Sequence, residues 1–84
     1  MGKFEKLLSR VLSGDSDANI PFDDLCQLLR RFGFEERTKG SHRIFVKPDV
    51  MQQIVLQPQG GKAKRYQVRQ VRELIEEYGL GGEE

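Results

Sequence analysis

The chain has 84 residues, of which 37% are hydrophobic and 32% are charged, and its formal net charge is +1. This length fits one domain and excludes a two-domain cofactor-binding enzyme. No apolar run approaches the roughly 18 residues that a membrane span needs, no secretory signal opens the chain, and the single cysteine, Cys26, excludes an internal disulfide. We therefore expect a soluble, cytoplasmic protein.

Two helices are predicted in the first part of the chain. Apolar residues recur at helical spacing at Phe4, Leu7, Leu8, Val11 and Leu12. This spacing predicts an amphipathic helix that ends near Gly14, and the polar residues 14–19 are typical of a linker. Pro21 favours the start of a second helix. Its apolar side carries Phe22, Leu25, Cys26, Leu29 and Phe32, and Gly33 favours its end.

Three strands are predicted after Gly33, where the apolar spacing changes. The candidate strands are residues 34–38, 42–47 and 51–57, and their short connections favour an antiparallel meander. A loop over residues 59–62 leads to a third helix from Tyr66 to Tyr78. Its apolar stripe consists of Val68, Val71, Leu74, Ile75 and Tyr78. The order α-α-β-β-β-α predicts an α+β fold, a three-stranded antiparallel sheet with helices on one face.

Charged residues are segregated along the chain. Residues 37–72 hold nine basic residues and one acidic residue, whereas residues 73–84 hold five glutamates and no basic residue. A block of one sign raises the local potential, so the basic block favours a polyanionic partner such as RNA. The alternative is a solvated basic face without a partner.

His42, the single histidine, lies in this basic block, where a turn that contains Gly40 meets the second strand. An imidazole accepts or donates a proton near neutral pH. On RNA it could take the proton from a ribose 2′-OH, which then attacks the adjacent phosphate while a nearby cation stabilises the developing charge. The alternative is a packed histidine, because His42 shares a strand face with Ile44 and Val46, which the helices would cover.

A second candidate site precedes the third helix. Residues 60–65 combine two glycines with three basic residues, and with the backbone N–H groups of the helix start they form a candidate phosphate cradle. A flexible loop with solvated charges is the alternative. Arg65, Arg69 and Arg72 recur at the spacing i, i+4, i+7 and so line one stripe of the helix. Such a stripe suits phosphate contacts along duplex RNA.

The other candidate residues favour structural roles. Cys26 lies on the apolar side of the second helix and is expected in the core. Ser41 adjoins His42, but neighbouring strand residues point to opposite faces, so a Ser–His nucleophile pair is not expected. Tyr66 and Tyr78 are interpreted as helix packing rather than base stacking. No metal site and no cofactor are expected, because the chain has no second histidine and no pair of cysteines.

Several of these segments, taken in order over roughly residues 20–80, resemble the HicA family of toxin ribonucleases from prokaryotic toxin–antitoxin pairs. They are Leu28–Phe34, Lys39–His42, Ile44–Phe45, Ile54–Leu56, Gly60–Lys62 and the final helix ending at Tyr78–Leu80. The resemblance implies a fold like a double-stranded-RNA-binding domain over residues 19–80. Residues 1–18 would then be an extra N-terminal helix and linker, and residues 81–84 a flexible tail.

The resemblance also implies an activity. It implies a toxin that cleaves mRNA independently of translation, acts as a metal-independent endoribonuclease with His42 as the catalytic residue, and is neutralised by a HicB-type antitoxin. We expect RNA contacts from Lys39, Gly40, Ser41, Arg43, Lys62, Lys64, Arg65 and Arg69. Two alternatives stay open. One is a non-catalytic RNA-binding module, and the other is a protein-interaction domain in which the first helix and the acidic tail mediate assembly.

Overall fold

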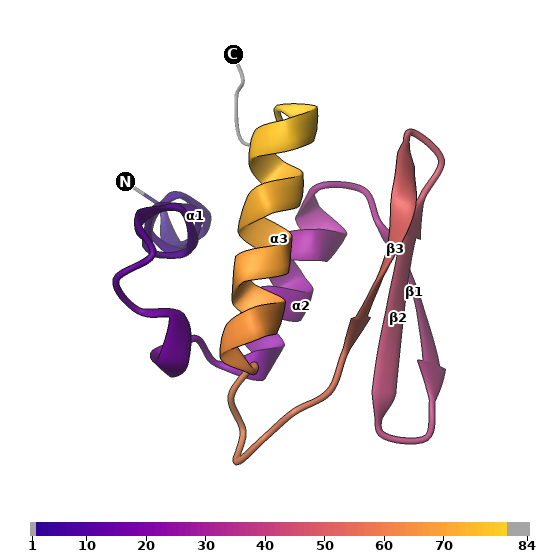
Figure 1. Ribbon diagram of the computed structural model, residues 1–84, viewed down its shortest axis with the longest axis horizontal. Helices are drawn as coiled ribbons and strands as arrows, with labels where there is room; N and C mark the ends of the chain where they lie inside the picture. The colour runs from indigo at the N-terminus through magenta and orange to yellow at the C-terminus, as the bar shows by residue number, and fades with distance from the viewer. Residues whose placement is uncertain (1, 81–84) are drawn as a thin grey trace.

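The computed structural model describes residues 2–80 and has the predicted element order (Figure 1). The predicted flexible tail, residues 81–84, lies outside the described residues. The helices and strands are α1 (Lys3–Ser13), the short 3₁₀ helix η1 (Asp17–Asn19), α2 (Phe22–Arg31), β1 (Glu35–Lys39), β2 (His42–Lys47), β3 (Val50–Leu56) and α3 (Arg65–Tyr78). The predicted α+β fold is thereby confirmed. Strand β2 has its predicted bounds, and β1 and β3 are each displaced by one residue from the predicted ranges.

The three strands form an antiparallel sheet in the order β1-β2-β3, and the helices lie against one of its faces (Figure 1). Phe45 of β2 pairs with Ile54 of β3, and both side chains are fully buried. Because side chains alternate along a strand, the neighbours of Phe45 point away from the helices. This alternation leaves the second face of the sheet open.

The first helix shares the core of the other elements. Leu7 and Val11 of α1 are buried in the same apolar cluster as Leu25 of α2 and Val71 of α3. The ring of Phe4 also meets that of Phe32 edge-on, with centroids 5.8 Å apart. Helix α1 is therefore part of the hydrophobic core.

Arg72 links α3 to the N-terminal segment. Its guanidinium donates hydrogen bonds to Asp17 at 2.9 and 3.2 Å and to the carbonyl oxygen of Val11 at 3.1 Å. The exposed fraction of each charged side chain is 17%. The expectation that Arg72 continues a phosphate-binding stripe with Arg65 and Arg69 is therefore wrong, because an ion pair within the fold occupies its head group.

Candidate nucleic-acid interface

His42 is exposed at the start of β2, on the open face of the sheet. It shares this face with Ile44 and Val46, as the alternation predicts, but the helices cover the opposite face, where Phe45 is fully buried. The alternative of a packed histidine is therefore wrong. The reason is that Phe45, paired with the buried Ile54, fixes which side of β2 enters the core.

Exposed residues of the turn between β1 and β2 surround His42. Lys39 is its cross-strand partner, so Gly40 and Ser41 form the turn between them. Gly40 has a φ angle of 62°, in the left-handed region that glycine adopts without strain. The hydroxyl of Ser41 accepts a hydrogen bond of 3.3 Å from Nε2 of Gln57, just after β3. The turn thus places a cation beside the imidazole and connects it to the end of β3.

Arg43 follows His42 but points to the helix side of the sheet. Its guanidinium donates a 2.8 Å hydrogen bond to Glu36 and lies 5.6 Å from the ring centroid of Phe22. Arg30 also donates to Glu36, at 2.6 and 3.1 Å. The Arg30 hydrogen bond, reinforced by Arg43, lowers the pKa of Glu36 below its ordinary value. These contacts give Arg43 a structural role on the face opposite His42, and its contact with RNA stays a prediction.

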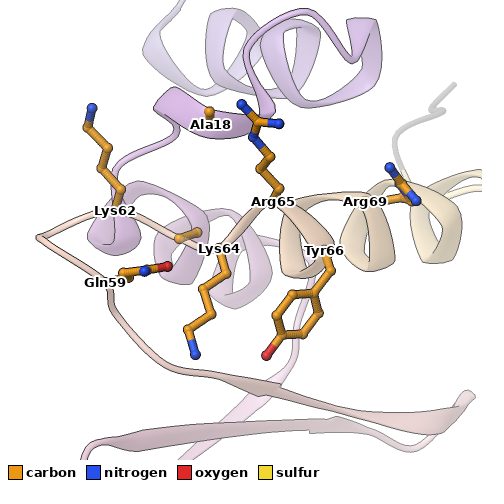
Figure 2. Close-up of a pocket in the computed structure, with 8 residues that line it drawn as sticks. Ala18, Gln59, Lys62, Lys64, Arg65, Tyr66 and Arg69 are labelled. Atoms are coloured by element: carbon orange, nitrogen blue, oxygen red, sulfur yellow. The ribbon is translucent and has the colours of Figure 1, made fainter.

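The basic residues of the second candidate site gather around one open pocket of about 550 Å³ (Figure 2). We call it the basic pocket, and it is lined by Ala18, Gln59, Lys62, Ala63, Lys64, Arg65, Tyr66 and Arg69. The sequence-predicted cations Lys62, Lys64, Arg65 and Arg69 are therefore brought together. Lys39 and His42 lie outside this pocket, on the sheet.

Hydrogen bonds hold the loop that forms the basic pocket in place. Gln59 and Lys62 exchange backbone hydrogen bonds of 2.8 and 3.1 Å around Gly60 and Gly61, whose φ angles are 60° and 78°. Two positive φ angles in a two-residue turn are typical of a type I′ turn, which favours glycine. The carbonyl oxygen of Gly61 accepts a 3.0 Å hydrogen bond from the N–H of Phe22. The alternative of an unsupported flexible loop is not favoured by this geometry.

Tyr66 is the residue of this region whose position differs from the prediction. Its side chain is 62% exposed and lines the basic pocket, so the interpretation of Tyr66 as helix packing is wrong. A signal was present in the sequence, because Tyr66 is out of phase with the apolar stripe that begins at Val68. Tyr78 is half-buried, and its hydroxyl donates a 2.8 Å hydrogen bond to Gln52. The packing interpretation is therefore correct for Tyr78.

The turn at His42 and the basic pocket lie at the same end of the molecule (Figure 1). The β1–β2 turn and the loop from β3 to α3 both occur there. Gln57 contacts Ser41, and Gln59, two residues later, lines the pocket. Two residues of extended chain span at most about 7 Å. The turn at His42 is thus adjacent to the edge of the pocket that Gln59 lines, and both sites lie along one end of the molecule.

The remaining reactive or metal-binding side chains of the described residues do not form a second site. Cys26 is fully buried, as predicted, and burial raises the pKa of its thiol to about 11. Within residues 2–80 no three His, Cys, Asp or Glu side chains are grouped so that they could hold a metal ion. None of the helices formed by these residues is long and apolar enough to cross a membrane.

The fold and the site define a small α+β protein whose exposed histidine and basic residues share one end of the molecule. Its sequence from residue 22 to residue 80 matches the family described as the HicA toxin of bacterial toxin–antitoxin systems. The chain therefore belongs to the HicA toxin family, and the class of protein is a toxin of a toxin–antitoxin system. Comparisons with curated proteins and with solved structures found no match.

Proposed function

We propose that this toxin is an endoribonuclease that cleaves mRNA, with His42 as the residue that transfers the proton. The observation that carries the proposal is the position of His42. The imidazole is exposed on the open sheet face, paired across the hairpin with Lys39 and at the same end as the basic pocket. Membership of the HicA family supports it.

The reaction that this arrangement supports is an internal transesterification of RNA. His42, as a general base, takes the proton of a ribose 2′-OH, and the 2′ oxygen then forms a bond to the adjacent phosphorus. The bond from phosphorus to the 5′ oxygen breaks, and that oxygen takes a proton from water. Lys39 stabilises the negative charge on the phosphoryl oxygens. The products are a 2′,3′-cyclic phosphate and a 5′-hydroxyl.

The surrounding residues bind the RNA backbone in this proposal. Lys39, Gly40 and Ser41 of the turn contact the nucleotides that flank the reacting phosphate. Lys62, Lys64, Arg65 and Arg69 of the basic pocket hold phosphates farther along the strand. A single histidine fills one proton-transfer role, so the enzyme is slow compared with nucleases that use two.

We further propose that a HicB-type antitoxin inhibits the cleavage. The support for this partner is membership of the HicA toxin family, whose proteins act in toxin–antitoxin pairs. Titration of the purified toxin with such an antitoxin is expected to abolish cleavage at equimolar protein. Undiminished cleavage in a stable complex would contradict inhibition.

Product analysis tests the proposed reaction. Purified full-length protein is incubated with a 5′-labelled oligoribonucleotide in EDTA, alongside the same sequence with 2′-O-methyl groups. We expect fragments that end in a 2′,3′-cyclic phosphate from the first substrate. The second should be bound and uncut, because the attacking hydroxyl is blocked. Fragments from both substrates would contradict attack by the 2′-OH.

A non-catalytic RNA-binding module is the second candidate function. It is favoured by one observation, which is that the basic pocket gathers its four cations without including His42. In that case both oligonucleotides would bind, and neither would be cut under any of the conditions tested.

A further inference from the structure

We propose that the basic pocket is a subsite for one unpaired nucleotide of the RNA, with Tyr66 as the platform on which its base stacks. This inference rests on the proposed function only in taking RNA as the ligand. It adds that the strand which enters the pocket is single-stranded, and it assigns specificity for that strand to an aromatic residue away from His42.

The exposure of Tyr66 is the first observation. The side chain is 62% exposed in the first turn of α3, where it lines the pocket instead of the core. Nζ of Lys64 lies 6.0 Å from the centroid of its ring. Figure 2 shows the side chains of Tyr66 and Lys64 extending from the start of α3 toward the sheet. An accessible ring beside a cation suits a nucleotide, whose base stacks on the ring and whose phosphate pairs with the cation.

The charge of the pocket is the second observation. Four of its eight lining residues are lysine or arginine, and in the described part of the chain no carboxylate lines it. None of the ion pairs within residues 2–80 engages these four cations. Asp17, the acidic residue of neighbouring η1, is paired with Arg72 instead. Lys64, beside the ring of Tyr66, is therefore available to a phosphate, whereas Arg65 extends toward Ala18, where it and Arg69 also line a neighbouring hollow with Asp15 and Asp17 (Figure 2).

The geometry of stacking decides between single-stranded and duplex RNA. Inside a duplex, each base is stacked between its neighbours, so its face is not accessible to a side chain, and only the outer faces of the two terminal pairs are open. The stacking of a base on Tyr66 therefore requires that this base is unpaired. The basic pocket is open on one side, and its volume of about 550 Å³ is of the size of small-molecule sites, so a nucleotide fits against it. In this proposal the basic residues at the start of α3 bind phosphates of a single strand, in place of the contacts with duplex RNA that their spacing suggested.

The N-terminal segment, outside the family match at residues 22–80, builds one wall of this subsite. Ala18 of η1 lines the pocket, and Oδ1 of Asn19 accepts a 3.3 Å hydrogen bond from Nζ of Lys62. The carbonyl oxygen of Ile20 accepts a 2.9 Å hydrogen bond from the N–H of Ala63. The subsite thus depends on residues that precede the matched region.

Binding measurements with the full-length protein test the subsite. The probes are a fluorescent single-stranded 2′-O-methyl oligonucleotide, which resists 2′-OH attack, and a longer duplex that contains the same sequence, so that its two terminal pairs contribute little. Tyr66→Leu should weaken binding of the single strand about tenfold, because a stacked base contributes roughly this much to affinity. The variant should leave binding of the duplex unchanged. Tyr66→Phe, which keeps the ring, should bind the single strand as the unsubstituted protein does.

Tyrosine fluorescence gives a second readout that does not depend on cleavage. The chain has no tryptophan and two tyrosines, so Tyr78→Phe leaves Tyr66 as the single emitter. Binding of the single strand should quench this emission, and the duplex should not. The inference is overturned if Tyr66→Leu binds the single strand as tightly as Tyr66→Phe, or if the emission is unchanged at saturation. Cleavage assays are separate, so a protein that shows stacking without cleavage would contradict only the proposed nuclease.

Discussion

Glu36 is the carboxylate that joins the sheet to α2 beneath the exposed face of β2. Its side chain is 19% exposed and receives hydrogen bonds from Arg30 and Arg43. These bonds lower its pKa, so the ionised form is stabilised by folding. The stabilisation is present above the ordinary Glu pKa of about 4.3 and is lost as the pH falls through the lowered value of the folded state.

Glu36→Gln should therefore lower the free energy of unfolding by about 1 kcal/mol at neutral pH. The difference between the two proteins should disappear in acid, where the carboxylate is protonated in both states. Urea unfolding at several pH values measures it. Glu35→Gln is the matched control, because the Glu35–Arg37 pair is mostly exposed and such pairs contribute little. An equal loss for both variants would contradict a specific role for Glu36.

At the scale of elements, α1 is part of the folding core, and its two faces differ. Leu7 is 7% exposed and Val11 is fully buried, whereas Leu12 on the same helix is 37% exposed. The family match begins at residue 22, after this helix. Its packing against α2 and α3 nevertheless makes the stability of the remaining elements depend on it.

Leu7→Ala should destabilise the protein by about 2–3 kcal/mol, because it leaves a cavity between α1 and the other helices. Leu12→Ala, at the exposed position of the same helix, should cost less than about 1 kcal/mol. Thermal and urea unfolding of both variants would measure the difference. Equal stabilities for the two variants would show that α1 is not packed as described.

Local spacing was sufficient to predict the elements, but long-range contacts decided the faces. The apolar spacing located α1, α2 and α3 because each buries one continuous stripe. In β2 the alternation defines two faces, and each face carries apolar side chains. Only the pairing of Phe45 with the buried Ile54 shows which face packs into the core. The role of Arg72 depended on Asp17, 55 residues away, which no local pattern could provide. The exposure of Tyr66, in contrast, could have been predicted from the sequence, because Tyr66 is out of phase with the apolar stripe of α3.

At the scale of the whole molecule, charge is divided along α3. Arg65 and Arg69 lie in its first half, whereas its second half holds Glu73, Glu76 and Glu77 and one basic residue, Arg72, which is paired with Asp17. The partial charges of a helix favour the opposite arrangement, with acidic residues at the start and basic residues at the end. The distribution therefore does not serve helix stability. It concentrates positive potential at the end that carries the β1–β2 turn (Figure 1), where it attracts a polyanion.

The affinity for RNA should fall steeply as salt is raised, because bound phosphates displace counterions. Lys64→Ala should reduce the slope of log K against log salt by about 0.7, the value for one phosphate contact on a single strand. Lys6→Ala, on the exposed side of α1, is the matched control and should leave the slope unchanged. Fluorescence titration with the uncleavable oligonucleotide measures both slopes. Identical slopes for the two variants would remove Lys64 from the interface.

The most direct test of the proposed nuclease is the single-turnover rate of RNA cleavage in EDTA by the unsubstituted protein and by His42→Ala. Loss of a general base predicts a fall of at least about 10²-fold in the rate. Because His42 is exposed, the variant should keep its fold and its affinity for the uncleavable strand. Equal rates in the two proteins would contradict the assignment of the cleavage to His42.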